Sequence, residues 1–135
     1  MNALRLPQAI VNDILTQAST HPSDEVCGLL GGRGNTASSC FPVANVSSDT
    51  RCRYVMDPAG QVDAMRRIRD AGNELVAIYH SHPQGLARPS LTDIQEANYA
   101  DAVYLVVSLG TEGVLELAGF NIKGESVSDV VLELI

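Results

Sequence analysis

Two of the chain's three histidines, His80 and His82, stand two residues apart where an apolar run ends. Successive side chains of a strand alternate between its faces, so both imidazoles should project from the same face of a strand end. Imidazole nitrogens are common zinc ligands, and a pair of them supplies half of a tetrahedral site. The sequence therefore predicts a metal site at the end of the segment "LVAIYHSH", residues 75–82.

Asp93 is the third candidate ligand. It follows His82 by eleven residues, after a loop with two prolines and a glycine, near the start of a predicted helix. Two histidines and one carboxylate leave the fourth zinc position to water, as in catalytic sites, whereas structural sites are normally closed by four protein ligands. Zinc lowers the pKa of such a water to about 7, which yields hydroxide at neutral pH.

A hydrolytic zinc site also needs a group that takes up and returns a proton. Glu25 is the candidate, because it directly precedes the predicted strand "VCGLLGG", where a glutamate could reach into a cleft. Ser90 lies between the histidines and Asp93, and its hydroxyl could hold the water or stabilise the developing oxyanion. Cys27, two residues after Glu25, could lie near the metal, where it would close the site if it were a ligand.

Each of these features also has a simpler explanation that the residues alone leave open. A strand edge can carry two histidines without a metal, and a lone glutamate such as Glu25 is usually a surface carboxylate. "SLTD", residues 90–93, is also a common helix start, with Ser90 as N-cap and Asp93 in the place of a capping box. The two roles of "SLTD" are compatible if the cap holds Asp93 in place.

The elements that would position these residues form a mixed α/β sandwich, a central sheet with helices packed on it. Helices are predicted over residues 7–19 and 91–100, and from Asp57 onwards with Val62, Met65 and Ile68 on one face. Strands are predicted over residues 26–32, 37–46, 51–56, 75–82, 102–109, 113–120 and 126–135. The last of these could also be a short helix. Strand 75–82 is apolar on both faces, so it should be central.

Composition limits the class of protein. The 135 residues, 45% hydrophobic and 19% charged, predict one folded domain spanning residues 1–135. No apolar run reaches the ~18 residues of a membrane helix and no signal-peptide pattern is seen, so we expect a cytoplasmic protein with no membrane partner. The net charge of −7 argues against a nucleic-acid partner. Five clustered arginines form either a solvated face or a docking patch for an acidic partner: Arg51, Arg53, Arg66, Arg67 and Arg69.

Together these features resemble the JAMM (MPN+) zinc metalloproteases, whose motif is an upstream glutamate, His-x-His, seven residues, serine, two residues and aspartate. Glu25, "HSH" at 80–82, Ser90 and Asp93 match every position, and "EVCGLLGG" and "YVMDP" also resemble the family. The resemblance implies a cytidine-deaminase-like MPN (JAB) fold, α/β, with a mixed central β-sheet flanked by helices. It implies that His80, His82 and Asp93 hold one catalytic Zn²⁺, that Glu25 is the general base and acid, and that Ser90 stabilises the tetrahedral intermediate.

The resemblance also implies a substrate. The family cleaves peptide or isopeptide bonds after the C-terminal Gly-Gly tail of ubiquitin-like proteins, and this chain is similar to its compact bacterial and archaeal, Mec+-like members. We therefore expect a peptidase or isopeptidase acting on a ubiquitin-like β-grasp protein, with a sulfur carrier favoured. The alternative is a non-catalytic zinc-containing module that binds ubiquitin-like partners. A cell-wall or phage-tail peptidase is less expected, and the oligomeric state, a homodimer included, stays open.

Overall fold

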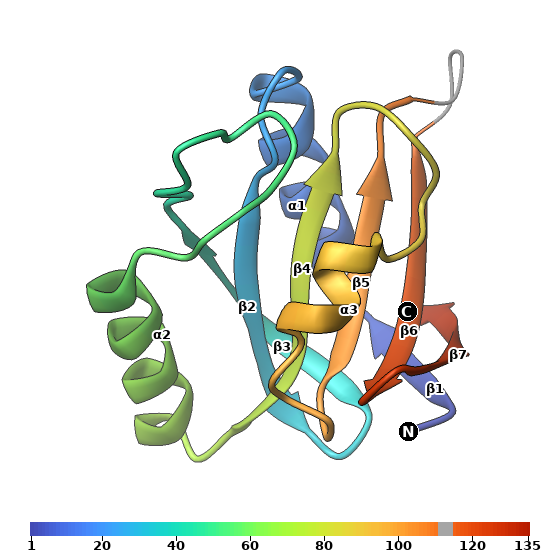
Figure 1. Ribbon diagram of the computed structural model, residues 1–135. Helices are drawn as coiled ribbons and strands as arrows, with labels where there is room; N and C mark the ends of the chain where they lie inside the picture. The colour runs from blue at the N-terminus through green and yellow to red at the C-terminus, as the bar shows by residue number, and fades with distance from the viewer. Residues whose placement is uncertain (111–114) are drawn as a thin grey trace.

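The computed structural model describes residues 1–110 and 115–135, which form three helices and seven strands (Figure 1). The helices are α1 (Gln8–Thr20), α2 (Pro58–Asp70) and α3 (Leu91–Glu96). The strands are β1 (Ala3–Leu6), β2 (Cys27–Arg33), β3 (Thr36–Val43), β4 (Glu74–His82), β5 (Val103–Ser108), β6 (Glu116–Lys123) and β7 (Ser126–Leu134). Across these described residues, no helix combines the length and the apolar character needed to span a membrane.

The strands form a single mixed sheet in the order β1-β3-β2-β4-β5-β6-β7, and β7 pairs back with β1 to close it. Strand β4 lies between the antiparallel β2 and the parallel β5, so its predicted central position is confirmed. The mixed α/β class is confirmed as well. Closure of the sheet was not predicted, because β1 has only four residues, too few for an alternating pattern to be recognised.

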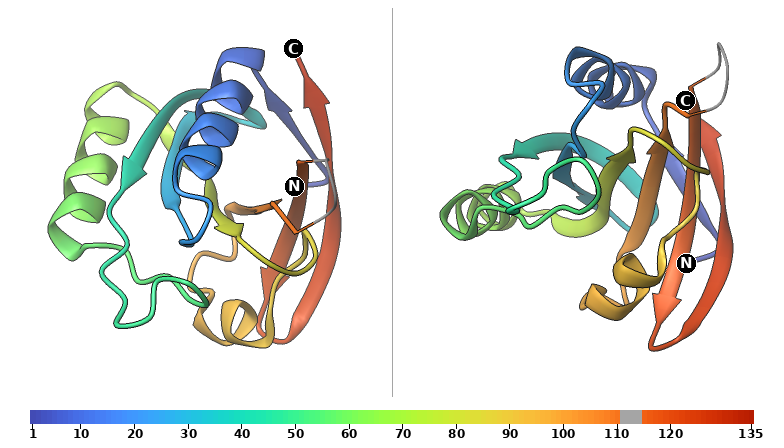
Figure 2. Two further views of the ribbon diagram at one scale, coloured as in Figure 1. Left: turned by 90° about the horizontal axis from the view of Figure 1, so that it is seen from above. Right: turned by 45° about the horizontal axis from the view of Figure 1, so that its top comes forward.

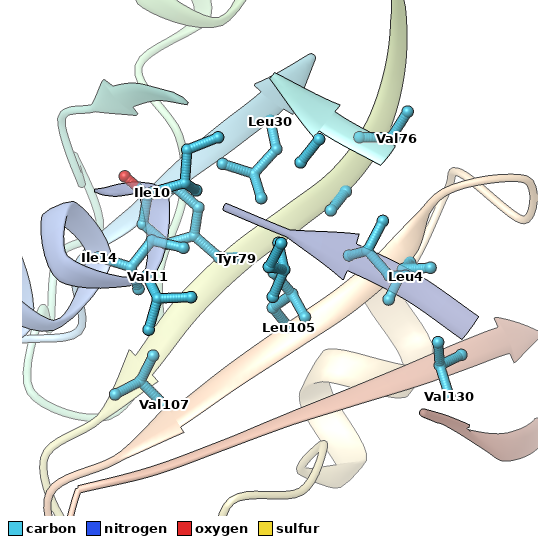
Figure 3. Packing of buried hydrophobic residues seen from close by; sticks show 14 of the residues in the cluster. Leu4, Ile10, Val11, Ile14, Leu30, Val76, Tyr79, Leu105, Val107 and Val130 are labelled. Atoms are coloured by element: carbon cyan, nitrogen blue, oxygen red, sulfur yellow. The ribbon is translucent and has the colours of Figure 1, made fainter. Parts of the chain in front are cut away.

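Helices bury both faces of the central strand. On one face, α1 packs Ile10, Val11 and Ile14 into a cluster that includes Tyr79 of β4 and Leu105 of β5 (Figure 3). These α1 residues recur at helical spacing, which is why one side of the helix is apolar.

The opposite face of the sheet carries a second buried cluster. There Ile78 of β4 packs with Ala64 and Ile68 of α2, and Figure 2 shows α1 and α2 on opposite sides of β2 and β3. Because strand side chains alternate, His80 and His82 project on the same side as Ile78. The histidines therefore face the half of the molecule that contains α2 and α3.

The prediction of a strand over residues 51–56 is wrong. Only Met56 pairs there, in an isolated bridge with Asn45. The Asn45 side chain donates from Nδ2 to the carbonyl of Arg53 (3.1 Å) and accepts at Oδ1 from the N–H of Val55 (3.0 Å). These bonds satisfy backbone groups that a strand partner would otherwise satisfy, so the segment between β3 and α2 stays a loop.

The end of α3 and the buried face of α2 also differ from the prediction. Helix α3 ends at Glu96 rather than at residue 100, because the N–H groups of Asn98 and Tyr99 donate to the hydroxyl of Tyr104, at 3.0 Å each. On α2, Val62 is 57% exposed, since the helix contacts the sheet through the stripe that contains Ala64 and Ile68.

The last two strands also differ in extent from the prediction. The first two residues of predicted strand 113–120 lie outside the described residues, and β6 continues to Lys123. A turn with Gly124 at φ +60° follows, and residues 126–134 form strand β7 rather than a short helix. A left-handed φ is one that glycine adopts at little cost, which allows the tight connection.

Gly28 in β2 is expected to tolerate no larger side chain. A Cβ added there would overlap the ring of Tyr79, which is fully buried and donates from its hydroxyl to Gln17 Oε1. We expect Gly28→Ala to lower the free energy of unfolding by roughly 2–3 kcal/mol, since overpacking forces buried side chains off their rotamers. Urea denaturation of the variant and the parent protein measures this, and equal midpoints would contradict the packing described here.

Candidate metal centre

The four predicted acid–base and ligand residues meet at the carboxyl end of β4. One candidate ligand atom from each of Glu25, His80, His82 and Asp93 lies within 4.8 Å of all the others. The two histidines and the glutamate are buried, and Asp93 is half-buried. Residues that are up to 68 positions apart in the chain thus converge on one point, through the start of β2, the end of β4 and the first turn of α3.

Three of these atoms are close enough to share one cation. The Nε2 atoms of His80 and His82 lie 2.9 and 3.1 Å from Oδ2 of Asp93, and 3.1 Å from each other. Ligand atoms about 2.0–2.1 Å from a tetrahedral zinc ion are about 3.3 Å apart. The spacing of the three atoms is therefore close to that of three ligands of one small ion.

The tautomer of His82 also favours a cation. Its Nδ1 lies 3.0 Å from the carbonyl oxygen of Leu86. A carbonyl can only accept, so Nδ1 carries the proton and the neutral ring keeps a lone pair on Nε2. That lone pair faces the Asp93 carboxylate, and the two acceptors repel each other unless a cation or a proton lies between them. The donor atoms of these residues are therefore chemically suited to bind a metal ion.

Helix α3 begins with a capping box that fixes Asp93. The Ser90 hydroxyl oxygen accepts from the N–H of Asp93 (3.1 Å), and Asp93 Oδ2 accepts from the N–H of Ser90 (2.9 Å). The predicted cap is therefore confirmed, and it coexists with the approach of the same carboxylate to both imidazoles. Ser90 itself is exposed at the edge of the site.

Glu25 is held by its backbone and leaves its carboxylate free. Its N–H donates to the carbonyl of Thr50 (2.6 Å), and its own carbonyl accepts from Asn45 Nδ2 (2.9 Å). Burial raises the pKa of Glu25 to about 7, with His82 opposing this shift and Asp93 adding to it. Oε1 of Glu25 is buried and has no hydrogen-bond partner among the described residues. The carboxyl group can therefore exchange a proton near neutral pH.

The other three ionisable groups of the cluster respond to the same surroundings. Burial lowers the pKa of His80 and so favours the neutral ring that binds metals. Burial alone would also lower the pKa of His82, but its hydrogen bonds to Asp93 and Leu86 raise it overall. Burial alone would raise the pKa of Asp93, but in the metal-free protein, with a proton on Nε2 of each histidine, hydrogen bonds from both rings hold it well below its usual range. Protons will therefore compete with a metal for His82 more strongly than for an ordinary histidine.

Tyr54 is a contact of the site to which the sequence analysis assigned no role. Its ring stacks on the ring of His80, with centroids 4.6 Å apart and planes at 25°. It comes from the loop between β3 and α2, and the neighbouring Arg53 ties that loop to α3 through an ion pair with Glu96, 2.6 Å long. In the sequence, the only indication of this contact is that Tyr54 belongs to the segment "YVMDP", which resembles the JAMM family. That resemblance does not indicate a role for the tyrosine.

Cys27 does not join the cluster, although it lies on a neighbouring strand. Its Sγ donates to the carbonyl of Val43 at 3.3 Å, and the residue is fully buried. Burial raises the pKa of the Cys27 thiol to about 12, with the charge of Glu25 adding to the effect. The thiol is therefore neutral and bonded to a backbone carbonyl, and it is not one of the clustered donor groups.

A cleft opens onto the site, and another hollow lies nearby. The cleft, of about 850 Å³, is lined by Glu25, His82 and Ser90 and also by Arg51 and Arg88. A second hollow of about 500 Å³ lies between α2, α3 and the loop that carries Tyr54. The buried carboxyl and imidazole groups are therefore reachable by a ligand from the first cleft.

The raised pKa of Glu25 predicts a pH-dependent stability of the metal-free protein. Below pH 4.5 the carboxyl group is protonated in both the folded and unfolded chains. Between pH 4.5 and about 7 only the unfolded chain releases its proton, so folding loses stability as the pH rises. Glu25→Gln lacks the titrating carboxyl group and serves as the reference. We expect the stability of the parent relative to this variant to fall by about 3 kcal/mol between pH 4 and pH 8. Urea denaturation after dialysis against a chelator measures this, and a flat difference would contradict it.

Sequence comparison with known families and proteins gives consistent matches. The family model described as prokaryotic homologs of the JAB domain matches residues 7–118. A desampylase of Haloferax volcanii is 39% identical over 93 residues, covering 67% of each chain. A probable TtuB-protein conjugate cleaving protease of Thermus thermophilus is 33% identical over 129 residues, covering 96% of this chain and 83% of its own. A CysO-cysteine peptidase of Mycobacterium tuberculosis is 31% identical over 122 residues, covering 89% and 83%.

Solved structures agree with the fold. The solution structure of a Desulfitobacterium hafniense protein superposes with a TM-score of 0.87 at 29% identity, over 98% of this chain and 92% of its own. A JAB1/MPN domain protein from Archaeoglobus fulgidus superposes with a TM-score of 0.62 at 19% identity, over the whole of both chains. The fold implied by the JAMM resemblance is thereby confirmed.

Proposed function

The chain belongs to the family of prokaryotic homologs of the JAB domain, and on that premise we propose that it is a zinc-dependent peptidase of JAMM type. It hydrolyses the bond that follows the C-terminal Gly-Gly of a ubiquitin-like β-grasp protein, with a sulfur carrier as the favoured substrate. The observation that carries this proposal is the convergence of Glu25, His80, His82 and Asp93 within 4.8 Å beside an open cleft.

In this proposal His80, His82 and Asp93 hold the zinc through Nε2, Nε2 and Oδ2. When bound, zinc supplies Lewis acidity, which makes water a nucleophile near neutral pH. The protein then has to orient these ligands, and it does so through the Leu86 carbonyl behind His82, the stacked ring of Tyr54 on His80 and the capping box around Asp93. Groups that fix ligand orientation in this way are needed for metal affinity.

Glu25 moves the proton in this proposal. Its buried carboxyl group lies beside the ligand atoms, and a pKa near 7 suits a group that must both take up and release a proton at neutral pH. A bound cation would lower that pKa and favour the basic form. Glu25 takes a proton from the attacking water and passes it to the leaving amine, and the exposed Ser90 hydroxyl at the edge of the cleft donates to the developing oxyanion.

The names of the relatives support the class of substrate. One relative is a desampylase, one is named for cleaving TtuB–protein conjugates, and one is a CysO-cysteine peptidase. A Gly-Gly tail has no side chains, so it can lie extended in a narrow channel beside buried ligands without steric overlap. These points favour a substrate whose folded β-grasp body stays outside the cleft while its tail enters.

The test is intact-mass spectrometry of β-grasp sulfur carriers that carry extra residues after Gly-Gly, incubated with the zinc-loaded protein. We expect loss of the extension with the carrier ending in Gly-Gly, and no loss after treatment with a chelator. A zinc-loaded protein that binds the carriers tightly but releases nothing from any extension would instead favour the non-catalytic binding module.

A further inference from the structure

Arg88 stands out among the charged groups of the large cleft because no side chain neutralises it. Within the described residues its guanidinium has neither an ion pair nor a hydrogen bond, and only its backbone N–H is bonded, to Leu86. Arg51 also lines the cleft, but its Nε already faces Asp49 Oδ1 at 3.6 Å. In a chain of net charge −7, an unpaired cation beside the buried site marks a place for an anionic group of a ligand.

The loop that carries Arg88 is held in place at several points. The Leu86 carbonyl accepts from both the Arg88 N–H (2.9 Å) and His82 Nδ1 (3.0 Å), and the Gly85 carbonyl accepts from the Ser108 hydroxyl (2.6 Å). The backbone of Arg88 is thus connected by hydrogen bonds, through the Leu86 carbonyl, to the proposed ligand His82. The guanidinium itself is exposed and, in the part of the chain that the structure describes, has no contact that would hold it elsewhere, so it is available to an anion that enters the cleft.

We propose that Arg88 binds the α-carboxylate of the residue that leaves, so that this chain prefers a single amino acid on the Gly-Gly tail to a lysine side chain. This inference rests on the proposed function. In a linear bond the leaving nitrogen is an α-amine, and a free carboxylate lies two bonds from it. In an isopeptide bond the leaving nitrogen ends a four-carbon aliphatic stem and has no anion near it. A bidentate arginine–carboxylate contact discriminates between these two groups.

The step itself is an ordinary hydrolysis. The carbon–nitrogen bond after the second glycine breaks, and a carbon–oxygen bond to water forms. One proton of that water goes through Glu25 to the leaving α-amine. The products are a carrier that ends in a glycine carboxylate and a free amino acid, which Arg88 holds until it diffuses from the cleft.

The experiment compares two substrates that differ in one charge. A β-grasp sulfur carrier extended by one cysteine after Gly-Gly is made with a C-terminal carboxylate and with a C-terminal carboxamide. We expect the parent protein to cleave the carboxylate form with a kcat/KM at least about 10-fold higher, as the loss of a charge-assisted hydrogen bond implies. Arg88→Gln should remove this preference by slowing only the carboxylate form, and Arg88→Lys should restore part of it.

The matched control is Arg66→Gln, the same substitution on an exposed residue of α2 outside the cleft. It should leave both rates unchanged. Equal cleavage of the two forms by the parent protein would overturn the inference, and so would an equal loss for both forms in Arg88→Gln, which would indicate general docking of an acidic carrier.

A binding measurement separates this inference from the proposed function. In the Glu25→Gln background, titration calorimetry should give tighter binding of the carboxylate form than of the carboxamide form, and adding Arg88→Gln should abolish the difference. If the parent protein cleaves neither form but this binding difference is present, the proposed function fails and the inference stands. If cleavage occurs without any preference in rate or binding, the inference fails and the proposed function stands.

Discussion

Replacing Glu25 with glutamine is expected to lower the rate of tail cleavage by about 10³-fold or more while the protein still binds one zinc ion. Glutamine has nearly the same shape as glutamate but cannot take up a proton from water, and positioned general acid–base groups contribute about 10²–10⁴-fold. The variant should also fold, because the backbone bonds of Glu25 to Thr50 and Asn45 do not involve the carboxylate. Intact-mass spectrometry of an extended carrier gives the rate, and plasma mass spectrometry gives the zinc content.

The control for this experiment is Glu125→Gln, which makes the same change at an exposed residue of the β6–β7 turn. It should have the activity of the parent protein. If Glu25→Gln kept full activity, Glu25 would be removed from proton transfer, and if it lost zinc together with activity, Glu25 would be acting as a ligand.

Removal of Asp93 is expected to lower zinc affinity by more than about 100-fold, because even residues that only orient ligands contribute 10–100-fold. Asp93 Oδ2 is the atom that both imidazole nitrogens approach, so without it the pair of histidines has no third ligand. Equilibrium dialysis against a zinc chelator of known affinity measures the change. We expect the same loss in Asp93→Asn as in Asp93→Ala, since a neutral amide oxygen is a much weaker zinc ligand than a carboxylate.

The comparison of the two variants separates metal binding from folding. Asp93→Ala also removes half of the capping box of α3, a loss of about 1 kcal/mol, whereas Asp93→Asn keeps a side-chain oxygen at that position. Asp101→Ala, at an exposed aspartate, is the control for removal of a surface charge. Zinc affinity that stayed unchanged in Asp93→Asn would assign the third ligand to another residue.

The site was more predictable than the sheet that carries it. Spacing along one strand is enough to place His80 and His82 on the same side, and the capping sequence is enough to orient Asp93 toward its own helix start. The approach of Glu25 is different, because it depends on the pairing of β2 with β4, in which Cys27 lies opposite His80. No pattern within either segment encodes that register. The place of Glu25 before a predicted strand makes it a candidate, and the JAMM motif supports the link to the histidines.

Two of the errors in the fold have a common physical origin. The segment 51–56 has the alternation of a strand, but the amide of Asn45 satisfies its backbone, and helix α3 stops where the hydroxyl of Tyr104 accepts two N–H groups. Both are contacts between a polar side chain and a distant backbone, which local periodicity does not register. The stacking of Tyr54 on His80 was missed for the same reason, since it joins a loop to a strand.

The central claim is that His80, His82 and Asp93 coordinate one zinc ion and leave a position for water beside Glu25. An anomalous difference map from zinc-loaded crystals, recorded on both sides of the zinc absorption edge, tests it most directly. We predict a single peak about 2.0–2.2 Å from Nε2 of both histidines and from a carboxylate oxygen of Asp93, with a fourth ligand that is not protein. A peak elsewhere, or one with Glu25 as a fourth protein ligand that closes the site, would contradict the account.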